Sequence, residues 1–162
     1  MNVERKRLPF VLATGMTVPL LTLLLLAVDV EAKTRRFTAD NATWRAECSG
    51  CHVAYPPALL PAADWRQLMG SLARHFGADA SVDPSVATEI DRFLAANAGR
   101  GDSRATEAQP RITTTRWFRH QHDEVSAAVF RSPSVETAAN CAACHPGAAT
   151  GDFNEHAVRI PH

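Results

Sequence analysis

The sequence has no excess of either charge, no cysteine outside two short motifs and no second long apolar run. Its 162 residues include 17 basic and 17 acidic side chains, so the formal net charge is zero. A nucleic-acid-binding chain needs a basic excess, and this composition therefore argues against a nucleic-acid partner. After one apolar stretch near the N-terminus, no segment is apolar enough to predict a membrane-spanning helix.

All four cysteines belong to two copies of the pentapeptide C-x-x-C-H, at residues 48–52 and 141–145. This spacing is the attachment signature of c-type haem. Cysteines three positions apart share one helical turn, so their thiols can bond to the two vinyl groups of one porphyrin edge. The next residue, a His, is then placed to face the iron as its proximal ligand. The motifs predict two covalently bound c-type haems, held by Cys48, Cys51 and His52 and by Cys141, Cys144 and His145.

Two other uses of paired cysteines fit this pattern less well. The pairs of a tetrathiolate zinc site are usually about 15–20 residues apart, whereas Cys51 and Cys141 are ninety positions apart. Zinc also gives no reason for a His directly after each pair. A thioredoxin-like redox pair would need a strand before the motif, a helix after it and only one copy. Haem attachment is therefore the favoured interpretation.

The N-terminus predicts export from the cytoplasm. A basic segment at 5–7 precedes an apolar stretch at 8–28, which is followed by the small-residue pattern of Val30-Glu31-Ala32. This order is typical of a signal peptide over residues 1–32 that is cleaved after Ala32. Covalent haem attachment in bacteria takes place outside the inner membrane, so the leader and the motifs both predict a periplasmic protein. The alternative is an uncleaved anchor, because about twenty apolar residues just span a bilayer, and membrane association is expected only through this segment.

The rest of the sequence predicts a mostly α-helical protein with two small lobes, each wrapping a c-type haem, and with long irregular connections. Residues 98–110 are small, charged and without periodicity, which is typical of a linker. This linker divides an N-terminal haem lobe at 33–97 from a C-terminal haem lobe at 111–162. With so little protein to form a core, each lobe is expected to pack against its haem.

Apolar spacing, caps, prolines and glycines predict individual elements within the lobes. Residues 111–115 are expected to be extended, and a short segment at 117–130 is expected to be helical. No pair of strands is indicated. Longer helices are expected at 42–51, at 61–76, from 84 to just before Gly99, and from 132 to 145, where the last would carry the second motif.

The second axial ligand of each iron decides whether a haem binds small molecules or only exchanges electrons. Met69 is the only methionine after the leader, and its apolar neighbours predict a role in the core. His75 lies in an apolar stretch and is expected to be an iron ligand. His120 and His122 are both candidates, but residues two apart on a helix point in different directions, so one is expected to face an iron. His156 and His162 lie near the C-terminal end, where solvated or packing roles are expected.

Three stretches, 48–81, 111–125 and 140–161, resemble the bacterial dihaem cytochrome c family. The resemblance covers nearly all of the chain after the leader, in the right order. It implies two low-spin haems with bis-His ligation. The LMxxLxxHFG segment assigns His75, paired here with the first haem, and the WFxxxHxE segment assigns His122 to the second, with His120 as the alternative. The loop at Tyr55 is expected to pack on the first haem.

The expected function is electron transfer and not catalysis, because an iron with two His ligands has no position open to substrate or oxygen. The best-known members of the family reduce an oxygen-binding monohaem cytochrome, the sphaeroides haem protein. The resemblance therefore implies an acceptor of that type, and a membrane b-type cytochrome or another quinol-linked protein is the expected donor. The alternatives are a dihaem enzyme or ligand sensor with one open haem, such as a peroxidase-like protein, and a haem subunit of a larger redox complex.

Overall fold

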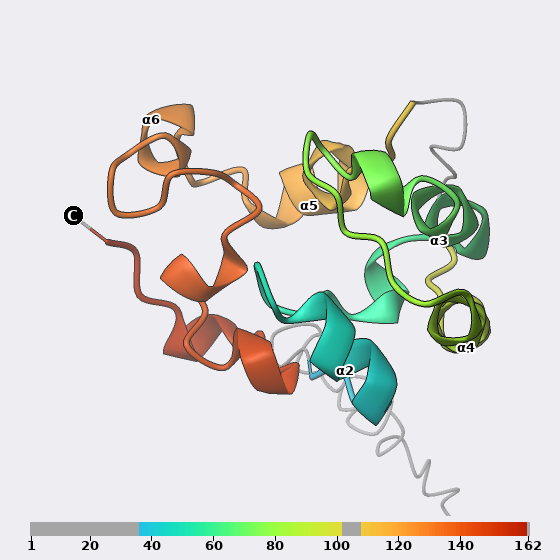
Figure 1. The fold of residues 1–162 in the computed structure, drawn as a ribbon. Coiled ribbons are helices and arrows are strands. Elements are labelled where there is room, and N and C mark those ends of the chain that lie inside the picture. The colour runs from blue at the N-terminus through green and yellow to red at the C-terminus, as the bar shows by residue number, and fades with distance from the viewer. Residues whose placement is uncertain (1–35, 102–107, 162) are drawn as a thin grey trace, which may run out of the picture. The chain divides into compact units, whose positions relative to one another are not determined.

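The computed structural model describes residues 36–101 and 108–161, drawn in colour in Figure 1. The described residues form short helices joined by irregular segments, with two isolated bridges and no β-strand among them. This confirms the prediction of a mostly α-helical fold. Within these ranges, no helix has the length and apolar character needed to cross a membrane. The predicted leader, the central part of the predicted linker and His162 lie outside the described residues.

Three helices, α2 (Ala42–Cys48), α3 (Ala62–Met69) and α4 (Pro84–Ala96), build the main core. α4 contacts both of the others and lies beside α3 in Figure 1. Ile90 and Leu94 are four positions apart on α4, so both point to the same side of the helix. The apolar faces meet in one cluster, which consists of Trp44, Leu60, Trp65, Leu68, Ile90 and Leu94.

Side-chain caps fix where the helices of this core begin. The Asn41 side chain accepts a hydrogen bond from the Trp44 N–H at the start of α2. At the start of α4 the Asp83 side chain accepts one from the Ser85 N–H, and Pro84 occupies the first turn. These contacts satisfy amide groups that a helix leaves unpaired at its N-terminus. The start predicted for the third helix is therefore confirmed.

The helix predicted over 61–76 is wrong in its second half, because α3 ends at Met69. Gly70 is a poor helix former, and the Ser71 hydroxyl donates to the carbonyls of Gln67 and Leu68. A 3₁₀ turn, η2 (Leu72–Arg74), follows, and Phe76 then adopts a φ of 50°. His75 consequently lies in a turn after η2 and not on α3.

After residue 110 the chain forms only short elements. They are η3 (Ile112–Thr114), α5 (Arg116–Gln121), α6 (Ala127–Phe130), η4 (Cys141–Ala143), η5 (Ala148–Thr150) and η6 (Glu155–Ala157). The helical segment predicted at 117–130 is present as two helices. The extended structure predicted at 111–115 is wrong at its centre, where the hydroxyls of Thr114 and Thr115 donate to the carbonyls three residues before them.

The helix predicted over 132–145 is also wrong, because only η4 is helical there. Glu136 has a φ of 70°, which a right-handed helix cannot include. The Asn140 side-chain amide donates to the Val135 carbonyl, so it competes for a carbonyl that a helix would use. The second motif therefore lies on a single 3₁₀ turn between irregular segments.

Residues far apart in the sequence are joined at an isolated bridge. The Phe37 N–H donates to the Gly151 carbonyl at 2.8 Å, and Arg36 pairs with Asp152 at 2.7 Å. Gly151 has a φ of 74°, and a Cβ at this position would lie 2.3 Å from the Phe37 carbonyl oxygen. The bridge joins segments assigned to different lobes, and the division into lobes stays a prediction.

Candidate haem-binding sites

The first C-x-x-C-H motif lies at the end of α2. Cys48 is the last residue of that helix, and Cys51 and His52 follow in the next turn. The His52 Nδ1 is 2.8 Å from the Val53 carbonyl oxygen. A carbonyl oxygen only accepts hydrogen bonds, so Nδ1 carries the proton and Nε2 presents a lone pair. His52 is thus in the tautomer that binds a metal ion through Nε2.

The second motif has a different local scaffold. Cys141 begins the 3₁₀ turn η4, and Cys144 follows its end. The His145 N–H donates to the Cys141 carbonyl at 2.8 Å, which closes one helical turn across the motif. The two cysteines and the His are therefore on one turn, as attachment to a single porphyrin edge requires.

Each motif His faces a second His from a distant part of the chain. The ring centroids of His52 and His75 are 6.3 Å apart, and those of His122 and His145 are 6.1 Å apart. An imidazole nitrogen lies about 2 Å from a first-row metal ion, so two rings on opposite sides of one ion have centroids about 6 Å apart. Both pairs have the spacing that one shared ion needs.

The protonation states of the paired rings also suit metal binding. The His122 Nδ1 is 2.9 Å from the Phe118 carbonyl oxygen, so this ring is oriented in the same way as His52. The Nδ1 atoms of His75 and His145 are buried and have no hydrogen-bond partner among the described residues. Burial, and then the charge of the facing His, lowers the pKa of both rings. The His75 and His145 rings thus favour the neutral form, which is the form that binds metal.

Each of the four rings contacts an aromatic side chain. The Tyr55 ring stacks on His52 at 4.4 Å, and the Phe118 ring stacks on His122 at 4.1 Å. Phe118 was not predicted to be part of the site, although it precedes His122 by one helical turn, a spacing that brings side chains together. The other two contacts, also not predicted, are Phe76 with His75 at 4.8 Å and Phe153 with His145 at 5.1 Å.

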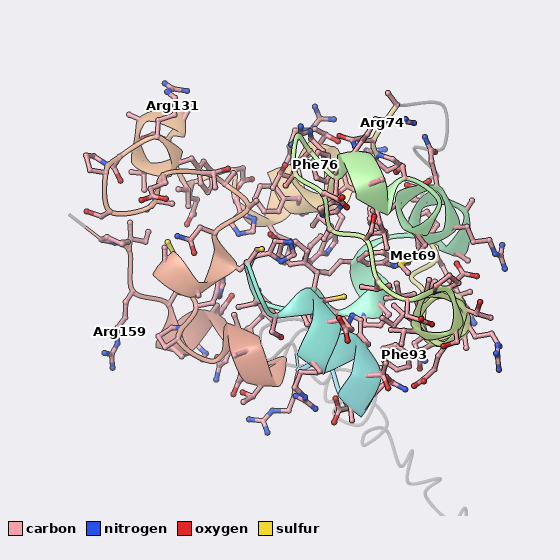
Figure 2. All side chains as sticks on the ribbon, in the orientation of Figure 1. Met69, Arg74, Phe76, Phe93, Arg131 and Arg159 are labelled. Carbon is pink, nitrogen blue, oxygen red and sulfur yellow. The ribbon has the colours of Figure 1, made fainter. Side chains whose placement is uncertain are left out.

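The remaining candidate ligands lie away from both pairs. His120 has 78% of its side chain exposed, with Asp123 at 4.0 Å. It lines an open pocket of about 800 Å³ with Trp117 and Arg116, and none of the paired histidines lines that pocket. Met69 packs against the core cluster on the side of α3 and α4, as Figure 2 shows. His156 is exposed beside Glu155.

The described cysteines are not gathered around one common point as the ligands of a zinc ion would be. Burial raises the pKa of the Cys48 and Cys141 thiols to about 11. In 36–101 and 108–161, no group of three or more His, Cys, Asp or Glu side chains could hold a metal ion by itself. The arrangement fits a porphyrin attached at each motif, with two axial imidazoles for each iron.

Short helices around two C-x-x-C-H turns, each with an opposed pair of histidines, define a c-type cytochrome with two haem sites. The family model for dihaem cytochrome c matches residues 44–153. The chain belongs to the dihaem cytochrome c family.

Solved structures agree with this family. The new diheme cytochrome type c from Shewanella baltica OS155 is 38% identical, with a TM-score of 0.67, over 75% of this chain and 93% of that chain. The diheme cytochrome c from Rhodobacter sphaeroides is 42% identical, with a TM-score of 0.63, over 72% of this chain and 99% of that chain. A structure of the protein purified from the same organism is 43% identical, with a TM-score of 0.57, over 70% of this chain and 96% of that chain. No curated protein matches this chain.

Membership confirms three predictions. The fold is the helical fold of dihaem cytochromes c, the chain binds two c-type haems, and the protein is a haem electron-transfer protein. When bound, each haem supplies an iron that gains and loses one electron. The two thiols of each motif would anchor a porphyrin. Aromatic rings contact the four imidazoles, and backbone carbonyls orient those of His52 and His122.

Proposed function

We propose that this protein is a periplasmic electron carrier in which both haem irons have two His ligands. His52 and His75 bind the first iron, and His122 and His145 bind the second. The observation that carries this proposal is the centroid distance of 6.3 Å in one pair and 6.1 Å in the other. The exposed side chain of His120 supports the choice of His122 over its neighbour.

Bis-His ligation restricts the chemistry to electron exchange. An iron with protein ligands on both faces offers no coordination position to oxygen, peroxide or another substrate. The backbone carbonyls of Val53 and Phe118 hold His52 and His122 in the orientation for binding. A site whose rings are held in this way opposes ligand exchange, so the proposed function is that of a carrier and not of an enzyme or gas sensor.

The carrier would relay single electrons between a membrane donor and a soluble acceptor. We propose a b-type cytochrome or another quinol-linked protein as donor, and a monohaem cytochrome of the sphaeroides haem protein type as acceptor. Support comes from the likeness to the Rhodobacter sphaeroides diheme cytochrome c and from the predicted export signal. Contacts with such partners are expected to be small and short-lived, as redox encounters are.

Low-temperature EPR of the fully oxidised protein tests the ligation. Two low-spin ferric signals are expected, with no high-spin signal, and the reduced protein should not bind carbon monoxide. The far-red absorption band of a sulfur–iron bond should be absent, because Met69 belongs to the core. A high-spin ferric haem, or rapid carbon monoxide binding, would contradict the proposal that both irons are closed.

Two neighbouring substitutions test the assignment of the second site. His122→Ala should convert one of the two haems to the high-spin state, because it removes the ring that faces His145. His120→Ala is the matched control and should leave both haems low-spin, because its side chain is exposed. The reverse result would show that His120 is the ligand.

The acceptor is tested by mixing the reduced protein with an oxidised monohaem cytochrome of the proposed type in a stopped-flow instrument. Rapid, saturable oxidation of both haems is expected. A rate no faster than that seen with an unrelated cytochrome c would contradict this choice of acceptor and leave the ligation unaffected.

A further inference from the structure

Tyr55 contacts both haem-binding segments at once. Its ring stacks on the His52 ring, with centroids 4.4 Å apart and planes 17° from parallel. Its hydroxyl donates to the Ala139 carbonyl at 2.6 Å, across 84 positions of sequence. Ala139 is two residues before Cys141, the first cysteine of the second motif. One side chain therefore joins a proposed ligand of the first iron to the attachment segment of the second haem.

The segment that carries Tyr55 is held firmly on the first site. Val53 accepts the Nδ1 hydrogen bond of His52, so residues 53 and 55 fix that ring from two directions. Pro56 and Pro57 follow and are both buried, and proline restricts the backbone. The Trp65 indole donates to the Pro57 carbonyl at 2.7 Å, which ties this segment to the core.

The accepting segment is ordered as well. The Asn140 N–H donates to the Thr137 carbonyl, and the Asn140 side chain donates to the carbonyl of Val135. Val135 is 1% exposed and anchors this stretch in the interior. The Ala139 carbonyl is thus a fixed acceptor, and the Tyr55 hydroxyl can hold the second motif in place against the first.

We propose that Tyr55 is a positioning residue that docks the two haem-binding segments on each other and so sets the rate of electron exchange between the two haems. This inference rests on the proposed bis-His carrier function. One electron leaves the reduced haem and arrives at the oxidised one, while Tyr55 keeps its proton and is neither oxidised nor reduced. No external oxidant or reductant takes part in this exchange.

Two substitutions separate the contributions of the ring and the hydroxyl. Tyr55→Phe keeps the stacked ring and removes the O–H···O bond, and Tyr55→Leu removes both. The matched control is Phe93→Leu, which removes an aromatic contact of Trp44 in the core cluster and leaves the Tyr55–Ala139 bond in place. After flash photoreduction of one haem, the redistribution of the electron between the two haems is followed by absorbance.

The expected effects differ among the three variants. Tyr55→Phe should slow redistribution by up to about fivefold, because one lost hydrogen bond lowers the equilibrium constant for docking of the two segments by about that factor. Tyr55→Leu should slow it further, and Phe93→Leu should leave it near the wild-type rate. If Tyr55→Leu does not fold, Tyr55→Phe decides the question, because it keeps the packing of the ring.

A second readout does not depend on the rate. Tyr55 is the only tyrosine in the sequence, so 3-fluorotyrosine gives one ¹⁹F resonance for this residue. That resonance should shift in two steps as the two haems are reduced in turn, because Tyr55 contacts both segments. A single step, with no response to one of the haems, would contradict the proposed double contact.

The outcomes distinguish this proposal from the function on which it rests. If both tyrosine variants redistribute the electron at the wild-type rate with low-spin haems, the role of Tyr55 is wrong and the carrier function stands. A Phe93→Leu variant slowed as much as Tyr55→Leu would also overturn the role of Tyr55. A high-spin haem in the wild-type protein would contradict the carrier function itself.

Discussion

The two haem sites have the same spacing between facing histidines but very different supports. The first is built around α2, α3 and α4, which bury a cluster of six large apolar residues. Beyond residue 110 the buried apolar residues are Phe118, Val135 and Ala148, on short helices, turns and loops. The first site therefore has a protein core of its own, whereas the second must obtain most of its apolar packing from the porphyrin.

The contrast shows that a histidine pair can be positioned in two ways. At the first site, His52 follows a helix that packs in the core. At the second, His122 follows the short helix α5 and stacks on Phe118, which is 7% exposed. The ring planes differ accordingly, at 37° in the first pair and 79° in the second. Similar spacing thus does not require a similar scaffold.

Removing either pair of cysteines should have the largest effect and should show most clearly how the support of the two haem sites differs. Replacing Cys141 and Cys144 with Ala prevents attachment of the second haem, and amides in 111–161 should then exchange at nearly unfolded rates. Replacing Cys48 and Cys51 should leave protection in α3 and α4, because their apolar side chains are buried against one another in a cluster of protein residues. Hydrogen exchange followed by mass spectrometry measures both results.

The two double variants serve as controls for each other, since each keeps one intact motif. Equal loss of protection in 84–96 and 111–161 in either variant would contradict the difference in support. Retention of full protection in 111–161 without the second haem would contradict it as well, because a core independent of the porphyrin would then have to exist there.

Truncating a core side chain should have a smaller effect and tests the same difference between the two haem sites. Leu94 is 2% exposed in the helical cluster, and Leu94→Ala should lower the free energy of unfolding by about 2–5 kcal/mol. Val135 is 1% exposed among loops, and Val135→Ala should cost about 1.5 kcal/mol, the value for two methyl groups. Denaturant titrations followed by far-UV circular dichroism give both values. A larger cost at Val135 than at Leu94 would reverse the assignment of the main core.

The smallest effect is expected at the exposed bridge. The Asn154 N–H, and then Arg36, hold the pKa of Asp152 below its ordinary value. A carboxylate whose pKa is lowered in the folded protein stabilises the fold at any pH above the pKa that it has in the unfolded chain. This stabilisation is lost as the pH falls through the lowered pKa of the folded protein. Asp152→Asn should therefore lower the melting temperature slightly at pH 7, less than Val135→Ala does. The difference should vanish in strong acid and shrink with salt, because Arg36 is 66% exposed.

The sequence was sufficient for the haem motifs, the helical class and the start of α4, because each depends on local spacing or capping. Asp83 and Pro84 form such a local signal, and the helix begins there. The resemblance to dihaem cytochromes c favoured His122 over His120, in agreement with the positions of the two side chains. Periodicity alone left both candidates open, because both rings lie on or next to one short helix.

The errors concern segments where side chains compete with helical hydrogen bonds. The apolar spacing through His75 continued past Met69, where α3 ends. The cap and proline at Ser132-Pro133 indicated a helix start but gave no sign of the positive φ of Glu136. The link from Tyr55 to Ala139 could not be predicted either, because no local pattern specifies a partner 84 positions away. Long-range contacts of single side chains are properties of the folded chain.

The bridge between Phe37 and Gly151 has a consequence for the order of assembly. Its partners are separated by more than a hundred positions, whereas the contacts of α3 with α4 are between segments close in sequence. Local contacts form early and distant ones late, because closing a long loop costs entropy before any contact is gained. A chain synthesised from its N-terminus can thus complete the helical core first. The segment at 36–37 can close onto the protein only after the second haem-binding motif has emerged.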